Sequence, residues 1–327
     1  MYFPYLRGRQ NELLCLRELL EVNKLYDTVI PIIEPVRCNS TFFTTITKFI
    51  EANRKIIIIK NPKVGKFESD YIELKNRIKE ETDEIKKGKL QSTLDNYKEL
   101  LKNSHVINGY LSDDSIILEC LEGKKNLKDI VLINSSADTF DYYEENGAQL
   151  EAFYTLIPKD EDFKDEVVGN TVILEDGYVK AKRNVDYIES PDELFSRSHL
   201  IYKKRDYVGF SDYSIVGNTY EENGFAPLAV AIHILYFGEK NELRVHHFVS
   251  DSNDNILDPA RKFEEAMHKL QNWEHLSSIP KTNGLKNLFD YYSNGKFPGL
   301  GVIKKCSIMH HIELIGQYLE ANKWYVV

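Results

Sequence analysis

Short apolar runs alternate with amphipathic stretches along the first half of the chain. Six runs are each long enough for one buried strand, at 2–6, 28–36, 55–62, 105–112, 129–136 and 149–158. The stretches between them have the apolar spacing of helices, at 10–23, 40–52, 113–122 and 139–146. Continuous apolar strands that alternate with helices are typical of a parallel sheet covered on both faces.

Two segments interrupt this alternation. Residues 68–102 are highly charged and favour helix, with one break near Lys87-Gly88-Lys89, which predicts an inserted helical hairpin. Such a charged run is most often a solvated face, and here it is also a candidate dimerisation arm. Residues 170–187 contain Asp176-Gly177, the centre of a two-residue turn, and predict a β-hairpin that decorates the core.

The C-terminal third has a less regular pattern. A seventh apolar segment at 206–213 precedes an antiparallel strand pair within 228–250, and helical patterns follow at 259–275, 285–292 and 307–322. We therefore expect one domain over 1–327, an α/β fold of the TIM-like (β/α)8 type with a distorted C-terminal third. An open doubly wound sheet is the alternative, because periodicity alone does not separate the two.

Composition narrows the class of protein. The 327 residues have a net charge of −9, which argues against broad non-specific binding to nucleic acid. The four cysteines are far apart in the sequence, which argues against a disulfide framework and favours a reducing cytosol. No signal peptide and no apolar run long enough to span a bilayer are found. We expect a cytoplasmic protein with no membrane partner.

The most informative polar residue is Glu34, which interrupts the apolar run IPIIEPV. A carboxylate buried in such a run costs several kcal/mol unless it is paired. Arg7, directly after the neighbouring strand, is the expected partner. Two interpretations stay open: a structural ion pair, or a carboxylate that serves acid–base chemistry or anion recognition.

Other polar side chains also follow predicted strands, where parallel barrels carry their chemistry. Asp212, in GFSDY, is either a turn former or a second carboxylate for acid–base chemistry or for a divalent cation. Glu34 and Asp212 are therefore the catalytic candidates. The candidate ligand contacts are Arg7, Lys60, Asn61, Asn134, His246 and His310.

Two pairs of adjacent histidines limit the choice of metal site. His246 and His247 lie in a predicted strand and point to opposite faces, so only one of them can face a site. His310 and His311, expected near the start of the last helix, diverge by about 100° and cannot chelate one ion together. The sequence also lacks the P-loop, the GxGxxG fingerprint, the GxSxG elbow and the common zinc motifs.

Several segments together resemble the beta protein family of phage and bacterial proteins. They are YFPYLRGRQNELLCLREL, IPIIEPV, KNPKVGKF, GFSDY and SIMHHIELIGQYL. The resemblance is closest to the bacterial branch, whose members are often encoded beside a small nuclease-like protein. It implies a barrel-like α/β fold and a prokaryotic, cytosolic setting in a mobile element or in antiviral defence. It brings no activity and no catalytic residues.

Three functions remain open from the sequence. The first is a component of a defence or mobile-element cassette that acts with a nuclease-like partner and binds a ligand or partner at the strand-end mouth of the barrel. The second is a barrel enzyme of the hydrolase or phosphoesterase type, acting on a phosphorylated small molecule or nucleotide. The third is a purely structural binding module. A homodimer through 68–102 is a further expectation.

Overall fold

In the computed structural model, which describes residues 1–222 and 227–322, the chain divides into two compact units. The barrel unit comprises Met1–Leu13, Ile30–Glu175 and Tyr202–Ser211. The sheet unit comprises Leu14–Val29, Asp176–Ile201 and Asp212–Val327. The sequence predicts one domain over 1–327, whereas the structure groups the chain into these two units.

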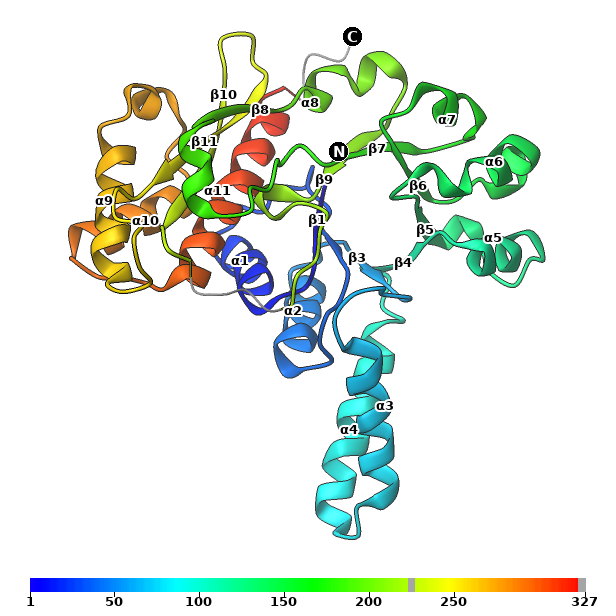
Figure 1. Cartoon of the computed structure of the whole chain (residues 1–327). Coiled ribbons are helices and arrows are strands. Elements are labelled where there is room, and N and C mark those ends of the chain that lie inside the picture. The colour runs from blue at the N-terminus through cyan, green and yellow to red at the C-terminus, as the bar shows by residue number, and fades with distance from the viewer. Residues whose placement is uncertain (223–226, 323–327) are drawn as a thin grey trace. The chain divides into compact units, whose positions relative to one another are not determined.

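Eight strands close into a parallel barrel, so the predicted TIM-like fold is confirmed (Figure 1). Their order is β1 (Tyr2–Leu6), β2 (Ile32–Ile33), β3 (Ile56–Ile59), β4 (Val106–Leu111), β5 (Ile130–Ile133), β6 (Tyr154–Pro158), β7 (Thr171–Glu175) and β9 (Gly209–Asp212). The ladder is continuous in register, with Tyr5 opposite Ile32 and Ile32 opposite Ile57. Buried β-branched residues such as the four isoleucines of β3 make these strands apolar on both faces.

Helices connect the barrel strands. They are α2 (Ser40–Glu51), α5 (Asp114–Leu121), α6 (Phe140–Asn146) and α7 (Glu161–Glu166), with 3₁₀ turns η1 (Leu127–Asp129), η2 (Ala137–Thr139), η3 (Gly147–Leu150) and η5 (Lys203–Arg205). α1 (Gln10–Glu21) begins in the barrel unit and ends in the sheet unit. Asn39 caps α2 and Asp113 caps α5, because each side chain accepts from a backbone N–H of the first turn.

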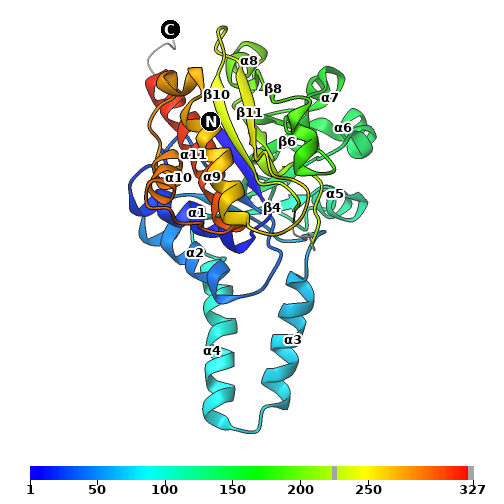
Figure 2. The same ribbon diagram turned by 60° about the vertical axis from the view of Figure 1, so that its left-hand side comes forward.

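The predicted helical insertion is present as α3 (Phe67–Glu80) and α4 (Glu84–Leu100), here called the arm. Figures 1 and 2 show the two helices side by side and extending away from the barrel strands. The break lies at 81–83 and not at Gly88, which is inside α4. Asp83 fixes that boundary because its carboxylate caps α4 by accepting from the N–H groups of Ile85 and Lys86.

The predicted β-hairpin at 170–187 is wrong. Thr171–Glu175 is the barrel strand β7, which pairs in parallel with β6, Thr155 lying opposite Thr171. Asp176-Gly177 resembles a hairpin turn, but the glycine there has a different role. A Cβ on Gly177 would lie 2.1 Å from the carbonyl oxygen of Phe195, so only glycine fits this close approach.

The sheet unit contains a three-stranded antiparallel sheet in the order β10 (Ala231–Phe237), β11 (Leu243–Val249) and β8 (Asp192–Ser196). The predicted strand pair within 228–250 is confirmed as β10 and β11, but it does not belong to the barrel. Helices α9 (Pro259–Gln271), α10 (Asn283–Ser293) and α11 (Leu300–Ala321) share an apolar core with this sheet. The unit also holds α8 (Ser198–Ile201), η4 (Asn184–Ile188), η6 (Ser214–Val216) and η7 (Glu274–Ser278). α11 begins before the predicted residue 307, so His310 and His311 lie in its middle.

Candidate functional site

Glu34 follows β2 at the carboxyl end of the barrel strands, and its side chain is fully buried. The expected ion pair with Arg7 is present, and Oε2 also accepts from the Tyr5 hydroxyl at 2.7 Å. Oε1 accepts from the backbone N–H of Lys63 at 2.8 Å. Protein donors therefore occupy both carboxylate oxygens, which is the arrangement that makes a buried charge tolerable.

The two candidate amides near this end of the barrel are similarly occupied. The Asn61 side chain donates to the carbonyl of Leu111 and accepts from its N–H, both at 2.9 Å, and so bridges the ends of β3 and β4. The buried Asn134 accepts from the Thr139 hydroxyl and donates to Tyr143 and to the carbonyl of Leu156. Both amides stabilise the strand ends, and their role as ligand contacts stays a prediction.

Lys60, directly after β3, differs from these neighbours. Its amine lies 5.8 Å from the centre of the Tyr97 ring, and none of the described carboxylates forms an ion pair with it. Burial lowers the pKa of this amine to about 8, because the charged form is poorly hydrated there. Of the ligand contacts predicted at this end of the barrel, Lys60 is the one whose charged group is not committed to a protein acceptor.

Asp212, the last residue of β9, belongs to a buried group in the sheet unit. Its Oδ1 accepts from the N–H of Ser214 at 2.8 Å, and its Oδ2 lies 3.6 Å from Nε2 of His311. The Ser214 hydroxyl lies 2.9 Å from Nδ1 of the same ring. These residue types also form hydrolytic triads, but there the serine faces Nε2 of the histidine. Here all three side chains are buried, so a substrate does not reach the hydroxyl in this conformation.

His310 connects elements of the sheet unit. Its Nε2 donates to the carbonyl of Leu235 in β10 at 2.6 Å, and its Nδ1 accepts from the hydroxyl of Thr282, the N-cap of α10, at 2.8 Å. Burial lowers the pKa of His310 to about 4, so the ring is neutral at pH 7. Both ring nitrogens are used by the protein.

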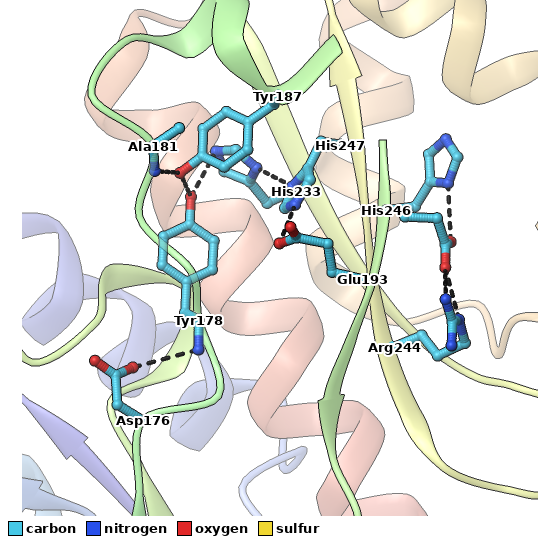
Figure 3. A network of polar contacts seen from close by, with 10 residues as sticks. Asp176, Tyr178, Ala181, Tyr187, Glu193, His233, Arg244, His246 and His247 are labelled. Carbon is cyan, nitrogen blue, oxygen red and sulfur yellow. Dashed lines mark hydrogen bonds and ion pairs between the residues drawn. The ribbon is translucent and has the colours of Figure 1, made fainter. Parts of the chain in front are cut away.

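His246 lies on β11, not on a barrel strand as its place in the sequence suggested. Its Nδ1 lies 3.1 Å from Asp192, which also accepts from Tyr236 at 2.7 Å and from Arg244 at 2.6 Å. Its ring packs against Trp273, with 4.7 Å between the ring centres. His247 points to the opposite face of the strand, as the sequence predicts (Figure 3).

On that opposite face, a chain of hydrogen bonds joins four ring side chains (Figure 3). The hydroxyls of Tyr178 and Tyr187 are 2.6 Å apart, and that of Tyr178 lies 3.1 Å from Nε2 of His233. Nδ1 of His233 lies 2.7 Å from Nδ1 of His247. Nε2 of His247 lies 3.5 Å from the carboxylate of Glu193 on β8.

A cleft of about 490 Å³ lies beside this chain within the sheet unit. Its size is in the range of small-molecule sites. The lining is formed by Ile188, Pro191, His246, His247, Phe248, Val249, Lys269, Asn272, Trp273 and Glu274. The walls thus combine aromatic rings with a few polar groups. Of the predicted ligand contacts, His246 is the one that lines this cleft.

The sequence pattern does not predict Tyr178, Tyr187, Glu193 or His233 as site residues. For His233 a signal was available, because it interrupts the apolar run LAVAIHILYF just as Glu34 interrupts IPIIEPV. The tyrosines have no comparable signal, since they lie in the segment 170–187, for which the sequence predicts a β-hairpin.

Within 1–222 and 227–322, no three His, Cys, Asp or Glu side chains are placed to hold a metal ion together. The four cysteines are free thiols. None of the helices in the described part of the chain combines the length and the apolar character needed to cross a bilayer. No family model matches this chain, and neither the curated proteins nor the solved structures gave a match. The resemblance to the beta protein family therefore remains a hypothesis.

Proposed function

We propose that this protein is a binding component that acts with a nuclease-like protein in a prokaryotic defence or mobile-element cassette. The setting comes from the sequence resemblance, and the choice of binding over catalysis comes from the barrel end. Glu34, the strongest catalytic candidate, is buried and has its oxygens occupied by Tyr5, Arg7 and Lys63. A general acid or base needs a free path to its substrate.

The observation that carries the proposal is that the arm, a solvated pair of helices, extends from the barrel on a fixed base. It grows out of the loop after β3, on the face where (β/α)8 barrels carry their functional loops. Its base is fixed by an aromatic cluster of Phe42, Phe43, Phe67, Tyr71 and Tyr97. Asp70 adds a hydrogen bond to the N–H of Cys38 and an ion pair with Arg37. A rigid base under a solvated two-helix extension suits a docking element.

The distal part of the arm has few buried apolar side chains. Ile78 and Leu94 are its buried residues beyond the base, whereas Ile85 is 74% exposed. Ile72, next to Tyr71 of the base, is 55% exposed. The charged side chains are of both signs, so the surface offers apolar contacts within a mixed polar rim. This composition resembles the surface of a protein–protein interface more than that of a nucleic-acid site.

The test is co-expression and co-purification of this chain with the product of its neighbouring gene, which we propose to be the nuclease-like partner. A variant without residues 74–80 and 84–90 shortens each helix by about two turns and keeps the base and the turn at 81–83. We expect the native chain to form a stoichiometric complex and this variant to bind at least tenfold more weakly, by light scattering and surface kinetics. Equal binding by both chains would contradict the role of the arm.

Point variants separate recognition from folding. Ile72→Glu and Ile85→Glu should each weaken the complex, because each places a charge where we expect an apolar contact. Val168→Glu is the matched control, since Val168 is an exposed residue of the same unit, 46% accessible, outside the arm. The mass of the isolated chain tests the homodimer in the same experiment. A dimer that the shortened arm abolishes would assign the arm to self-association instead.

One observation favours the alternative, a barrel enzyme acting on a phosphorylated small molecule or nucleotide. Lys60 places an amine without a carboxylate partner among the described residues at the end of β3, where an anion could bind. A panel of phosphoesters, assayed with and without Mg²⁺ or Mn²⁺, tests this function. Turnover that Lys60→Met lowers at least tenfold would support it, and no turnover on the panel would count against it.

A further inference from the structure

Residues 176–191, here called the strap, run along one face of the three-stranded sheet. The strap contributes Tyr178 and Tyr187 to the buried hydrogen-bond chain and Ile188 and Pro191 to the wall of the cleft. We propose that the strap is an acid-released wall of this cleft, fastened by the hydrogen-bond chain that runs from Tyr187 to His247. This inference is independent of the arm and of the proposed function.

The two ends of the hydrogen-bond chain fix its direction. At one end the backbone N–H of Ala181 donates to the hydroxyl oxygen of Tyr187 at 3.1 Å, because an amide can only donate. At the other end the Glu193 carboxylate can only accept, so Nε2 of His247 carries a hydrogen. Nδ1 of His247 is then an acceptor in the neutral ring.

Between these ends, the donor and the acceptor of each hydrogen bond are fixed when both rings are neutral. Tyr187 donates to Tyr178, which donates to Nε2 of His233. Nδ1 of His233 therefore carries a hydrogen and donates to Nδ1 of His247. With both rings neutral, the reverse direction would need a protonated Glu193 and would leave the hydroxyl hydrogen of Tyr187 without a partner. In the neutral state the contacts therefore assign one tautomer to each histidine.

A single added proton reverses the direction of this chain. Protonated His247 has two N–H groups and no acceptor, so its Nδ1 must donate to Nδ1 of His233, whose own hydrogen then lies on Nε2. Nε2 of His233 then donates to the hydroxyl oxygen of Tyr178, and Tyr178 donates to Tyr187. The hydroxyl hydrogen of Tyr187 is left without an acceptor beside the N–H of Ala181, so protonation costs the strap one buried hydrogen bond.

The surroundings determine the pH at which this happens. The titratable and charged groups that face the two rings are Tyr178 and Tyr187 from the strap, Asp192 and Glu193 from β8, His246 from β11 and Lys304 from α11. Burial lowers the pKa of His247 to about 4 and holds that of His233 well below its usual value of 6.5. A ring exposed by opening of the strap would return to a pKa of about 6.5. Protons therefore bind on opening, and acid favours the open form between pH 6.5 and 4.

The strap has other contacts that opening would break. Asn184 donates to the carbonyl of Ala229 at 2.8 Å, and the N–H of His247 donates to the carbonyl of Pro191 at 2.8 Å. The N–H of Asn218 donates to Asp176 at 2.8 Å, and Lys180 forms an exposed ion pair with Glu221. Val179 is 62% exposed and Ile188 is 49% exposed already, so the apolar surface that opening uncovers is mainly that of the buried Tyr178 and Tyr187 rings. Local opening of this kind needs less free energy than global unfolding. It would expose His247, a residue of the cleft wall that is now fully buried.

The test is hydrogen–deuterium exchange of the full chain at pH 7.5 and pH 5.0, corrected for the intrinsic rates. Opening that brings one imidazole into water should increase about 30-fold over this interval, and opening that exposes both rings should increase about 900-fold. His247→Asn keeps an acceptor for His233 but does not titrate, so one factor of about 30 should disappear from the strap peptides. His268→Gln, an exposed histidine of α9, should leave the change intact.

A second measurement keeps the proposal falsifiable if His247→Asn does not fold. Nitrogen chemical shifts at pH 7.5 should show His233 protonated at Nδ1 and His247 protonated at Nε2. Tyr187→Phe should raise strap exchange at both pH values while the pH dependence stays. Unchanged strap exchange at pH 5.0 in the native chain, an equal change in His247→Asn, or the opposite tautomers would overturn the proposal.

Discussion

The buried carboxylate of Glu34 in the barrel unit is balanced by opposite charge, whereas three buried histidines of the sheet unit are balanced by neutral hydrogen bonds. Glu34 is held by Arg7 and Tyr5 at the end of the barrel strands. In the sheet unit, His310 and the pair His233 and His247 are buried with lowered pKa values. Of the nine histidines, His105 alone lies in the barrel unit.

This difference predicts different sensitivities. An ion pair that is buried loses most when one partner is removed, because the other charge remains without compensation. A buried neutral histidine does not lower the free energy of unfolding at pH 7, but it lowers that free energy in acid, where the exposed ring of the unfolded chain binds a proton. The barrel unit should therefore be sensitive to charge deletion and the sheet unit to pH.

The largest effect is expected for Arg7→Met. The substitution leaves Glu34 buried without its cation, and we expect the free energy of unfolding to fall by about 3–5 kcal/mol. Urea denaturation followed by circular dichroism measures it. The double variant Arg7→Met with Glu34→Gln should recover part of the loss, because no uncompensated charge is left. A loss below about 1 kcal/mol for Arg7→Met would show that this pair does not stabilise the barrel.

A matched control lies at the same end of the barrel. Lys63 and Asp113 form an ion pair at 2.8 Å in which both side chains are substantially exposed. Lys63→Met should therefore cost less than about 1 kcal/mol. The contrast between the two methionine variants measures what burial adds to an ion pair.

Acid should destabilise the sheet unit first. The folded pKa of His310, about 4, lies below the unfolded value near 6.5, so the unfolded chain binds more protons between these limits. The free energy of unfolding should then fall by about 2 kcal/mol from this residue between pH 6.5 and 5. Peptide-resolved hydrogen exchange separates the two units. Loss of protection in the barrel peptides at a higher pH than in the α10 and α11 peptides would reverse the comparison.

A smaller effect is expected for Thr282→Val, which removes one partner of His310. The hydroxyl both donates to His310 and caps α10, so we expect a loss of about 1–2 kcal/mol. Thermal denaturation measures it. Thr93→Val is a control, because the Thr93 hydroxyl bonds to a carbonyl within its own exposed helix. Equal losses in the two variants would mean that the contact with His310 adds nothing.

The last prediction concerns Lys60 and applies at alkaline pH. Its amine should titrate near pH 8, well below an exposed lysine, when followed by NMR of the dimethylated protein. Because the folded pKa is lowered, the native chain should gain stability relative to Lys60→Met as the pH rises from 8 toward 10.4. A titration of Lys60 near 10.4 would show that the ring of Tyr97 and its neighbours do not dehydrate the amine.

Much of the fold could be predicted because buried parallel strands leave continuous apolar runs, such as the four isoleucines of β3. The order of the barrel strands β1 to β6 follows from those runs alone. β7 was missed because Asp176-Gly177 looked like a turn, and β8 because its sequence, Asp192–Ser196, has charged and exposed positions. The division into two units has no local signal, since α1 belongs to both.

Fewer residues of the candidate site than of the barrel could be predicted from the sequence. The ion pair between Arg7 and Glu34 was predictable, because a carboxylate within an apolar run requires a partner. The pairing of His233 with His247 follows from the register of the β10–β11 hairpin. The approach of Tyr178 and Tyr187 to these rings depends on how the strap crosses the sheet, with a sequence separation of 55 residues between Tyr178 and His233, and such long-range pairing is not encoded in the spacing of the residues.

The arm also gives the protein an adjustable reach. β3 and β4 pair directly, and Asn61 joins their ends, so closure of the barrel does not depend on how far α3 and α4 extend. Each residue of an α-helix adds about 1.5 Å, and seven residues make nearly two turns. Adding or removing seven residues in both helices would therefore move the tip by about 10 Å with little rotation. The length of the arm would then set the distance between the barrel and a partner bound at the tip.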